Sequence, residues 1–305
     1  MESVTAYAPG STSNVGPGFD CLGIAVAGIG DRVTARRARG IGVRVASVTD
    51  PRIPLEPDRN TAALAASEVV RRLGSLEGLE LVIRKGLPLS GGLGGSAASA
   101  VAGAVAANAL LEGGLNDAAL LQCALEAEAI VAGRHPDNVA PSLLGGAVVV
   151  LGTDPLRYVR LTVHPSLRFV FVTPGYGVLT AEARAVLPDS VSRADAVGQA
   201  ASLAALVLAL ERGNGDLLRD AIRDRLAEPS RIPLYPGFLE AREAALAAGA
   251  YGVAVSGAGP TLLAVVAEPI AAVVARTVAA AYERTGTKPA AVRVSSVDDR
   301  GARVE

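Results

Sequence analysis

The sequence predicts an α+β protein of two domains, the first over residues 1–155 and the second over 156–305. Its 305 residues suffice for one large domain or for two ordinary ones. Half of the residues are hydrophobic, which is ample for a core, and both halves contain strand-like and helix-like stretches. A shift in composition near Gly152-Thr153-Asp154-Pro155 indicates the boundary, although a pair of strands could straddle it.

The first half combines short strands with Ala- and Leu-rich helices. Residues 8–20 are rich in turn formers, and residues 31–48 alternate apolar and polar side chains as half-buried strands do. Asn60 is a residue type that caps helices. Strands are expected over 3–8, within 21–48, over 79–84 and within 142–151; helices are expected over 60–73, 96–111 and 117–132.

The second half contains the same two kinds of segment. Pro174 ends an apolar strand, and the turn Ser256–Thr261 joins two more. Strands are expected over 167–173, 251–255, 262–267 and 291–295; helices are expected from Leu179 and over 191–212, 215–226, 238–248 and 270–284.

The most distinctive stretch joins a glycine-dense turn to a helix. Glycines let a backbone wrap closely around a ligand, and the free N–H groups and dipole at a helix N-terminus attract anions. The stretch therefore predicts a phosphate-binding loop. Its members are Pro88, Leu89, Ser90, Gly91, Gly92, Leu93, Gly94, Gly95, Ser96 and Ala97. Ser96 lies in the first helical turn, where its hydroxyl can cap the helix or bind a metal on the phosphate.

Other interpretations of this loop are weaker. A Walker loop requires Lys before Ser or Thr, and Gly95 precedes Ser96 here. A dinucleotide fingerprint, read from Gly92, Gly94 and Ala97, requires a strand after its helix, whereas the residues after Asn116 are typical of another helix. A purely structural glycine turn is the remaining alternative.

Composition narrows the class of protein. The net charge of −1 shows no basic surplus for nucleic acid or anionic lipid. Lys85 and Lys288 are the sole lysines, so phosphate charge must be met by Arg, backbone amides or a metal. Cys21 and Cys123 suggest reduced thiols. No secretory signal is apparent and the apolar runs are interrupted before membrane-spanning length, so we expect a cytoplasmic protein without membrane partners.

Four motifs between Ala8 and Ala267 resemble those of the GHMP kinase family, in the same order. The glycine loop is similar to the family's Pro-x-x-x-Gly-Leu-Gly-Ser-Ser-Ala, with Gly95 in place of the first Ser. Two blocks resemble the homoserine kinases of that family in particular: Ala-Pro-Gly-Ser-Thr-Ser-Asn-Val-Gly-Pro-Gly-Phe-Asp over 8–20 and His-Pro-Asp-Asn-Val-Ala-Pro over 135–141. Ser-Gly-Ala-Gly-Pro-Thr over 256–261 resembles the family's C-terminal glycine motif.

This resemblance implies a fold and an activity. The fold would be the two-domain GHMP kinase fold, with an N-terminal domain like domain 2 of ribosomal protein S5, a ferredoxin-like C-terminal domain and the active site between them. The activity would be phosphorylation of the L-homoserine hydroxyl with ATP and Mg²⁺, giving O-phospho-L-homoserine for threonine biosynthesis. Homodimers are common in the family.

The resemblance also assigns residues. Substrate contacts carried over are Asn14, Asp20, His135, Arg184, Arg231 and Gly259; Mg²⁺ ligands are Ser96 and Glu128; nucleotide contacts are the phosphate-binding loop and Asn60; the catalytic set is Asn14, Asp20, Ser96, Glu128, Asn138 and Arg184. Without the resemblance, Asn60 reads equally well as a helix cap and Glu128 as a solvated helix charge. Related mevalonate kinases have an Asp near Asn138, and because an Asn cannot accept the hydroxyl proton, it is expected to position other groups.

Two alternatives remain open at this point. Another GHMP kinase could act on a different hydroxy acid or amino alcohol, although an amino acid suits the pairing of Asp20 with an ammonium and Arg184 with a carboxylate. A catalytically silent sensor of nucleotide or amino acid could keep the fold. Gly95 supports the sensor, whereas the presence of Ser96 and Glu128 opposes it.

Overall fold

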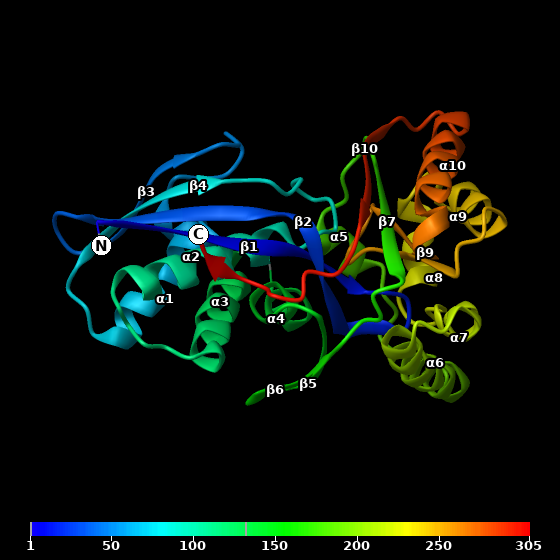
Figure 1. The fold of residues 1–305 in the computed structure, drawn as a ribbon, viewed down its shortest axis with the longest axis horizontal. Helices are drawn as coiled ribbons and strands as arrows, with labels where there is room; N and C mark the ends of the chain where they lie inside the picture. Colours follow the sequence, from blue (N-terminus) through cyan, green and yellow to red (C-terminus); the bar gives the residue numbers. More distant parts are fainter. Residues whose placement is uncertain (1, 132) are drawn as a thin grey trace.

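The computed structural model describes residues 2–131 and 133–305, and it has two lobes that lie side by side (Figure 1). The strands of the first lobe are β1 (Ser3–Asn14), β2 (Gly18–Ala38), β3 (Gly42–Val48), β4 (Gly78–Arg84), β5 (Ala147–Thr153), β6 (Leu156–Leu161) and β11 (Arg303–Val304). Within the described residues they form a seven-stranded sheet in the order β11-β1-β2-β4-β3, with β5 paired to β2 and β6 to β5. β3 and β4 are parallel, and the other pairs are antiparallel.

The helices of the first lobe pack against this sheet and against one another. They are α1 (Thr61–Leu73), α2 (Gly95–Leu110), α3 (Asp117–Val131) and α4 (Pro136–Leu144). Asn60 begins α1, because its Oδ1 accepts hydrogen bonds from the N–H groups of Ala62 and Ala63. α2 consists almost entirely of buried small residues, and a side chain at Gly103 would collide with the backbone of Ala62. The phosphate-binding loop therefore leads into a helix at the centre of the main core.

The second lobe has the arrangement that the sequence resemblance implies. Its sheet contains β7 (Leu167–Pro174), β8 (Gly252–Val255), β9 (Leu262–Ala267) and β10 (Pro289–Ser295), in the antiparallel order β10-β7-β9-β8. α9 (Phe238–Ala247) and α10 (Ala271–Arg284) complete a strand-helix-strand-strand-helix-strand unit, which is ferredoxin-like. The segments α5 (Thr180–Ala185), α6 (Arg193–Arg212), α7 (Gly215–Ala221) and α8 (Glu228–Arg231) come between β7 and α9. The predicted two-domain α+β fold class is confirmed.

Several predicted elements differ in extent. β1 continues past Ala8 to Asn14, because residues 10–13 pair with residues 23–26 of β2 despite their turn-forming composition. The helix predicted over 215–226 ends at Ala221. α3 ends at Val131, and Ala132, the last residue of the helix predicted there, lies outside the described residues.

The chain changes lobes later than the predicted boundary at 155/156. That position falls in the turn of a hairpin, because β6 pairs with β5 in the first sheet, with Val149 opposite Val159. The sheets place the change between β6 and β7. β11 then returns the end of the chain to the first lobe, where Val304 lies opposite Ala6.

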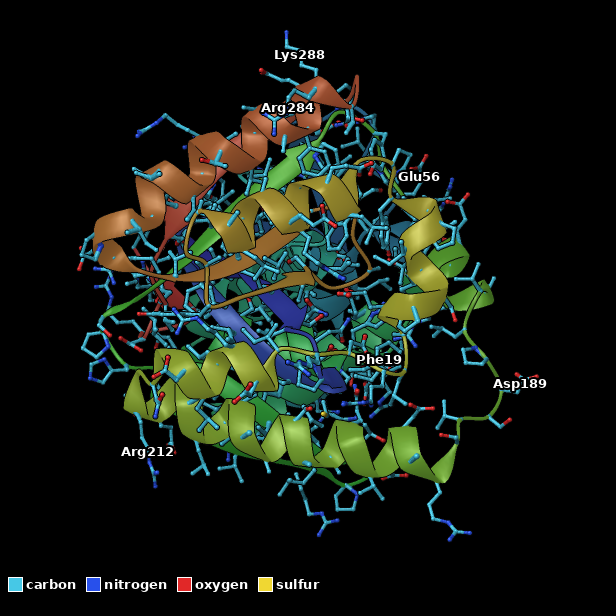
Figure 2. The ribbon with its side chains drawn as sticks, turned by 90° about the vertical axis from the view of Figure 1, so that its right-hand side faces the viewer. Phe19, Glu56, Asp189, Arg212, Arg284 and Lys288 are labelled. Atoms are coloured by element: carbon cyan, nitrogen blue, oxygen red, sulfur yellow. The ribbon has the colours of Figure 1, made fainter. Side chains whose placement is uncertain are left out.

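α6 is apolar over most of its length. By length and composition alone it could cross a membrane, which differs from the expectation that every apolar run is too short. A mostly buried core helix of a soluble protein passes the same test; in α6 22% of the apolar window is buried, and Leu206 and Leu210 belong to the main core. Its other face includes Val197, which is 63% exposed, and Leu208, which is 43% exposed. Figure 2 shows α6 along the lower edge of the view, ending near Arg212.

Candidate active site

A cavity of about 540 Å³ lies where the two lobes meet. Nearly all of the site residues predicted from the sequence line it: Asn14, Asp20, Asn60, Pro88 to Ser96, Glu128, His135, Asn138, Arg184, Arg231 and Gly259. Ala97 is the exception, because its side chain is fully buried within α2. The fold thus brings together segments that are as much as 245 residues apart, from Asn14 to Gly259 (259 − 14).

The phosphate-binding loop forms a concave turn immediately before α2. Ser90, Gly92 and Gly94 have φ angles of 52°, 70° and 63°, whereas the residues between them do not have positive φ. Such alternation makes successive N–H groups converge on one point and creates an anion-binding nest. Side chains at Gly92 and Gly94 would also collide with the Ser256 carbonyl and the Ser11 hydroxyl. The loop can therefore present backbone N–H groups, together with the N-terminus of α2, to an anion.

The second lobe holds this loop from outside. Ser256 Oγ donates to the Gly92 carbonyl (2.6 Å), and Thr261 Oγ1 donates to the Gly91 carbonyl (2.5 Å). Because a peptide group is planar, fixing these carbonyls also fixes the N–H groups that follow them. The glycine motif over 256–261 therefore shapes the phosphate-binding loop.

Lys85 braces the start of α2, a role that the sequence did not reveal. Its side chain is only 6% exposed and forms an ion pair with the fully buried Asp31. Lys85 Nζ also donates to the carbonyl of Gly95 (2.7 Å) and to Ser99 Oγ (2.9 Å). These three contacts use all three ammonium protons. Lys85 lines the cavity, so the signal that could have identified it is its position at the end of the strand before the loop.

Ser96 and Glu128 meet at the N-terminus of α2. Ser96 Oγ donates to Glu128 Oε1 (2.6 Å), and Glu128 Oε2 is buried with no hydrogen-bond partner among the described residues. His135 Nδ1 lies 3.7 Å from Glu128 Oε1. The described residues contain no group of three or more His, Cys, Asp or Glu that could hold a metal by themselves. A hydroxyl and a carboxylate with a free oxygen nevertheless fit Mg²⁺, which takes few protein ligands and completes its shell with phosphate oxygens and water.

Asp20 of β2 and Arg184 of α5 form an ion pair that joins the two lobes. Arg184 Nη1 donates to Asp20 Oδ2 (3.0 Å), and Nη2 donates to Asp20 Oδ1 (2.8 Å). These hydrogen bonds raise the pKa of the Arg184 guanidinium. Both side chains are partly exposed, at 39% and 43%, so the pair can exchange partners with a ligand at little cost.

Arg231 is a buried cation that has no acidic partner. Its exposure is 3%, and it takes part in no ion pair in the described part of the chain. Its Nε donates to the Ala183 carbonyl (2.8 Å), and its guanidinium stacks on Phe19, the residue labelled near the middle of Figure 2. Burial lowers the pKa of Arg231. Because a buried unpaired charge is costly, this arrangement favours an anion in the cavity.

Asp137 is a third carboxyl group of the cavity, after Asp20 and Glu128, and the sequence alone did not identify it. Burial, followed by the nearby negative charge of Asp20, raises its pKa to about 6. The neighbouring Asn138 is held by two serines, because its Nδ2 donates to Ser13 Oγ (3.1 Å) and its Oδ1 accepts from Ser11 Oγ (3.1 Å). The signal that could have identified Asp137 is its place in the His-Pro-Asp-Asn block, directly before Asn138.

Other predicted contacts already have protein partners. Asn14 Nδ2 donates to the Gly257 carbonyl (2.8 Å), and its Oδ1 accepts from the Asp20 N–H (3.0 Å). Asn60 caps α1 with Oδ1, and its Nδ2 donates to the Pro54 carbonyl (2.9 Å). Asn14, Val15 and Asp20 all have positive φ, so the backbone here is strained and held by its surroundings. Asn14 therefore fixes Asp20 relative to the second lobe.

Comparison with known proteins shows which family this chain and its fold resemble. The family model for the GHMP kinase N-terminal domain matches residues 60–146, and the model for the C-terminal domain matches residues 206–284. A homoserine kinase of Xanthomonas campestris is 42% identical over 267 residues, covering 87% of this chain and 82% of the relative. One of Methanopyrus kandleri is 45% identical over 269 residues, covering 86% of this chain and 87% of the relative. The crystal structure of homoserine kinase from Cytophaga hutchinsonii superimposes with a TM-score of 0.96 at 36% identity, covering 100% of this chain and 98% of that one.

Proposed function

This chain belongs to the homoserine kinases of the GHMP kinase family, and on that premise we propose that it transfers the γ-phosphoryl group of ATP to the hydroxyl of L-homoserine. The product is O-phospho-L-homoserine, an intermediate of threonine biosynthesis. The phosphate-binding loop and α2 hold the nucleotide phosphates, and the charged residues at the lobe junction hold the amino acid.

The observation that carries this proposal is the set of charges in the cavity. Its charged lining residues include two carboxylates, Asp20 and Asp137, and two guanidinium groups, Arg184 and Arg231. The lining also contains the proposed metal ligand Glu128 and the cations Arg52, Arg59 and Lys85. A zwitterionic amino acid supplies one ammonium and one carboxylate to such a set. Arg231 carries most weight, because it is buried and has no acidic partner in the described chain. On binding, the ammonium takes Asp20 from Arg184, and the guanidinium that is released joins Arg231 at the substrate carboxylate.

Ser96 and Glu128 are the residues that would hold Mg²⁺ on the phosphates. Their fit rests on the unpartnered Glu128 Oε2, which is buried beside the N-terminus of the phosphate-loop helix. When bound, the ion neutralises charge on the transferring phosphoryl group. Backbone N–H groups of the loop neutralise the remaining phosphate charge.

Positioning is the main task of the protein in this reaction. Phosphoryl transfer through a loose transition state depends on alignment and charge neutralisation, and little bond making precedes departure of the leaving group. Asn138 carries no acidic group and is fixed by Ser11 and Ser13, so it orients the substrate. Asp137 is a candidate to receive the hydroxyl proton, because it lines the cavity and its pKa of about 6 suits a weak base at neutral pH.

The proposal extends to compartment and assembly. Both Cys21 and Cys123 are free, which is consistent with a reducing cytoplasm. A homodimer could use the exposed face of α6, which includes the apolar residues Val197 and Leu208.

Asp20→Asn tests the substrate assignment. We expect the kcat/KM of this variant for homoserine to fall at least 100-fold, which corresponds to the loss of about one charge-assisted hydrogen bond or more. The Kd of MgATP, measured by calorimetry, should stay within about twofold. Asp189→Asn, on the loop between α5 and α6, is the control and retains both values (Figure 2). Equal loss of ATP and homoserine affinity in Asp20→Asn would contradict the assignment.

A further inference from the structure

A second cavity of about 670 Å³ lies between the lobes, next to the cavity described above. Residues 49–52 and 85–88 of the first lobe form one wall, and residues of β7 and β10 of the second lobe form the other. Arg52, Lys85, Pro88 and Leu93 line both cavities, so the stem of the phosphate-binding loop and the Arg52 side chain lie between them. None of the residues assigned above to the amino acid lines this second cavity.

The charges of this cavity do not balance. Arg52 is paired with Asp50, through Nε to Oδ1 (2.9 Å) and Nη2 to Oδ2 (2.6 Å), and Lys85 is paired with Asp31. Arg293 of β10 has no hydrogen bond or ion pair in the part of the chain that the structure describes, although it is partly buried. The cavity therefore has one uncompensated positive charge.

The rest of the lining is apolar with two hydroxyl groups. Pro51, Pro88 and Ala291 supply accessible apolar surface over the buried side chains of Leu87 and Phe171. Thr49 and Thr173 supply the hydroxyls. Ligand sites typically combine an apolar lining with a few polar groups that fix orientation. A guanidinium recognises a carboxylate through two parallel hydrogen bonds.

We propose that this cavity is a second ligand site, which binds a small monocarboxylate with an apolar body and is coupled to the phosphate-binding loop. The carboxylate pairs with Arg293, and the apolar body packs against Pro88 and Ala291, which are accessible apolar residues of the lining. The site is separate from the proposed kinase reaction, so the proposal does not depend on the identity of the phosphoryl acceptor.

Two hydrogen-bonded connections couple the walls of the cavity to the loop. On the second lobe, Thr173 Oγ1 lies 2.8 Å from Thr261 Oγ1, which donates to the Gly91 carbonyl. Because Thr261 uses its proton on Gly91, Thr173 is the donor in the first bond. On the first lobe, Thr49 Oγ1 accepts from the N–H of Lys85 (2.9 Å), whose side chain holds the Gly95 carbonyl. A ligand that draws either threonine hydroxyl toward itself alters the loop that holds the nucleotide phosphates.

Calorimetric titration of the full chain with 2-naphthoate, and with the neutral 2-naphthamide of the same shape, tests the binding claim. We expect saturable binding of naphthoate and at least tenfold weaker binding of naphthamide. Arg293→Gln should weaken naphthoate at least tenfold and leave kinase turnover without the probe unchanged. Lys288→Gln, at the exposed residue immediately before β10 and outside the cavity lining, is the charge-matched control and should bind naphthoate as the original chain does.

Reciprocal titrations test the coupling. Linkage requires that MgATP change the Kd of naphthoate by the same factor by which naphthoate changes the Kd of MgATP. We expect a factor of at least 3, and Thr173→Val should bring it close to 1 while naphthoate still binds.

The proposed site is overturned if naphthoate, benzoate and indole-3-propionate all fail to bind saturably below about 10 mM, a range that fragment-sized ligands reach. It is also overturned if Arg293→Gln binds naphthoate as well as the original chain does. The coupling is overturned if the factor is 1 in the original chain.

Discussion

Replacing Arg231 with Met separates the effect of this residue on the free energy of unfolding from its effect on the KM for homoserine. Arg231 is 3% exposed, without an acidic partner in the described chain, and its guanidinium lies over the ring of Phe19, 5.1 Å from the ring centroid. Met preserves the apolar stem and removes the charge. Loss of the hydrogen bonds to the carbonyls of Ala183 and Gly257 costs about 1 kcal/mol each. Removing an unpaired buried charge returns a desolvation penalty of several kcal/mol.

The two effects lead to opposite expectations for stability and for function. We expect the free energy of unfolding of Arg231→Met, measured by urea titration, to lie within about 1 kcal/mol of the original or above it, because the two terms offset. A charge-assisted hydrogen bond to the substrate carboxylate contributes about 1.5 to 3 kcal/mol, so the KM for homoserine should rise about tenfold to about a hundredfold. An ADP-release assay at saturating MgATP measures that change.

A substrate without a carboxylate shows whether the lost interaction is the proposed one. 3-Amino-1-propanol keeps the ammonium and the hydroxyl, so the original chain should prefer homoserine strongly, and Arg231→Met should lose most of that preference. Arg225→Met is the matched control, because Arg225 lies on the same segment and does not line the cavity. A loss of more than about 3 kcal/mol in stability with an unchanged KM would refute the reasoning, since that is the result expected of a paired structural arginine.

Three further predictions concern the remaining site residues. Because the pKa of Asp137 is about 6 when folded and near 3.8 when unfolded, the folded chain holds this proton more tightly, so stability decreases as pH rises from about 4 to about 6. Asp137→Asn should remove that decrease in urea titrations and also the acid limb near pH 6 in kcat/KM for homoserine; a limb that persists would contradict the assignment. Glu128→Gln should raise the Mg²⁺ concentration for half-maximal activity at least tenfold, because a carboxylate ligand is lost. The Kd of metal-free ATP should stay within about twofold. An unchanged Mg²⁺ requirement would exclude Glu128 as a ligand. Gly95→Ser should fold normally, because a Cβ there lies 3.5 Å from the Pro88 carbonyl oxygen and 3.6 Å from Lys85 Nζ, which are ordinary contact distances. The added hydroxyl should lower the Kd of MgATP by up to about tenfold. Weaker ATP binding would show that the glycine is required.

Local patterns predicted the elements whose reasons are local. The cap of α1 at Asn60, the glycine loop before α2 and the strand pair around the turn 256–261 each follow from residue types within a few positions. The extension of β1 to Asn14 did not, because its strand conformation depends on pairing with β2. The return of the chain end as β11 likewise depends on a partner about 300 residues away.

The candidate site shows the same division. Motifs brought attention to Asp20, Glu128 and Arg184, whereas burial and pairing distinguish Asp137 and Lys85. The sequence contains no sign that Arg231 lacks an acidic partner while Arg184 has one. Such differences arise from tertiary contacts, which a single sequence does not display.

Turnover of L-homoserine with MgATP is the measurement that tests the central claim most directly. ADP release should be compared for L-homoserine, L-serine, L-threonine, mevalonate and galactose, with ATP binding measured in parallel. The account predicts strong Mg²⁺-dependent turnover with homoserine and little with the others. ATP binding without turnover of any of these substrates would contradict it and indicate a sensor, and preferential turnover of another alcohol would overturn the assignment of Asp20, Arg184 and Arg231 to an amino acid.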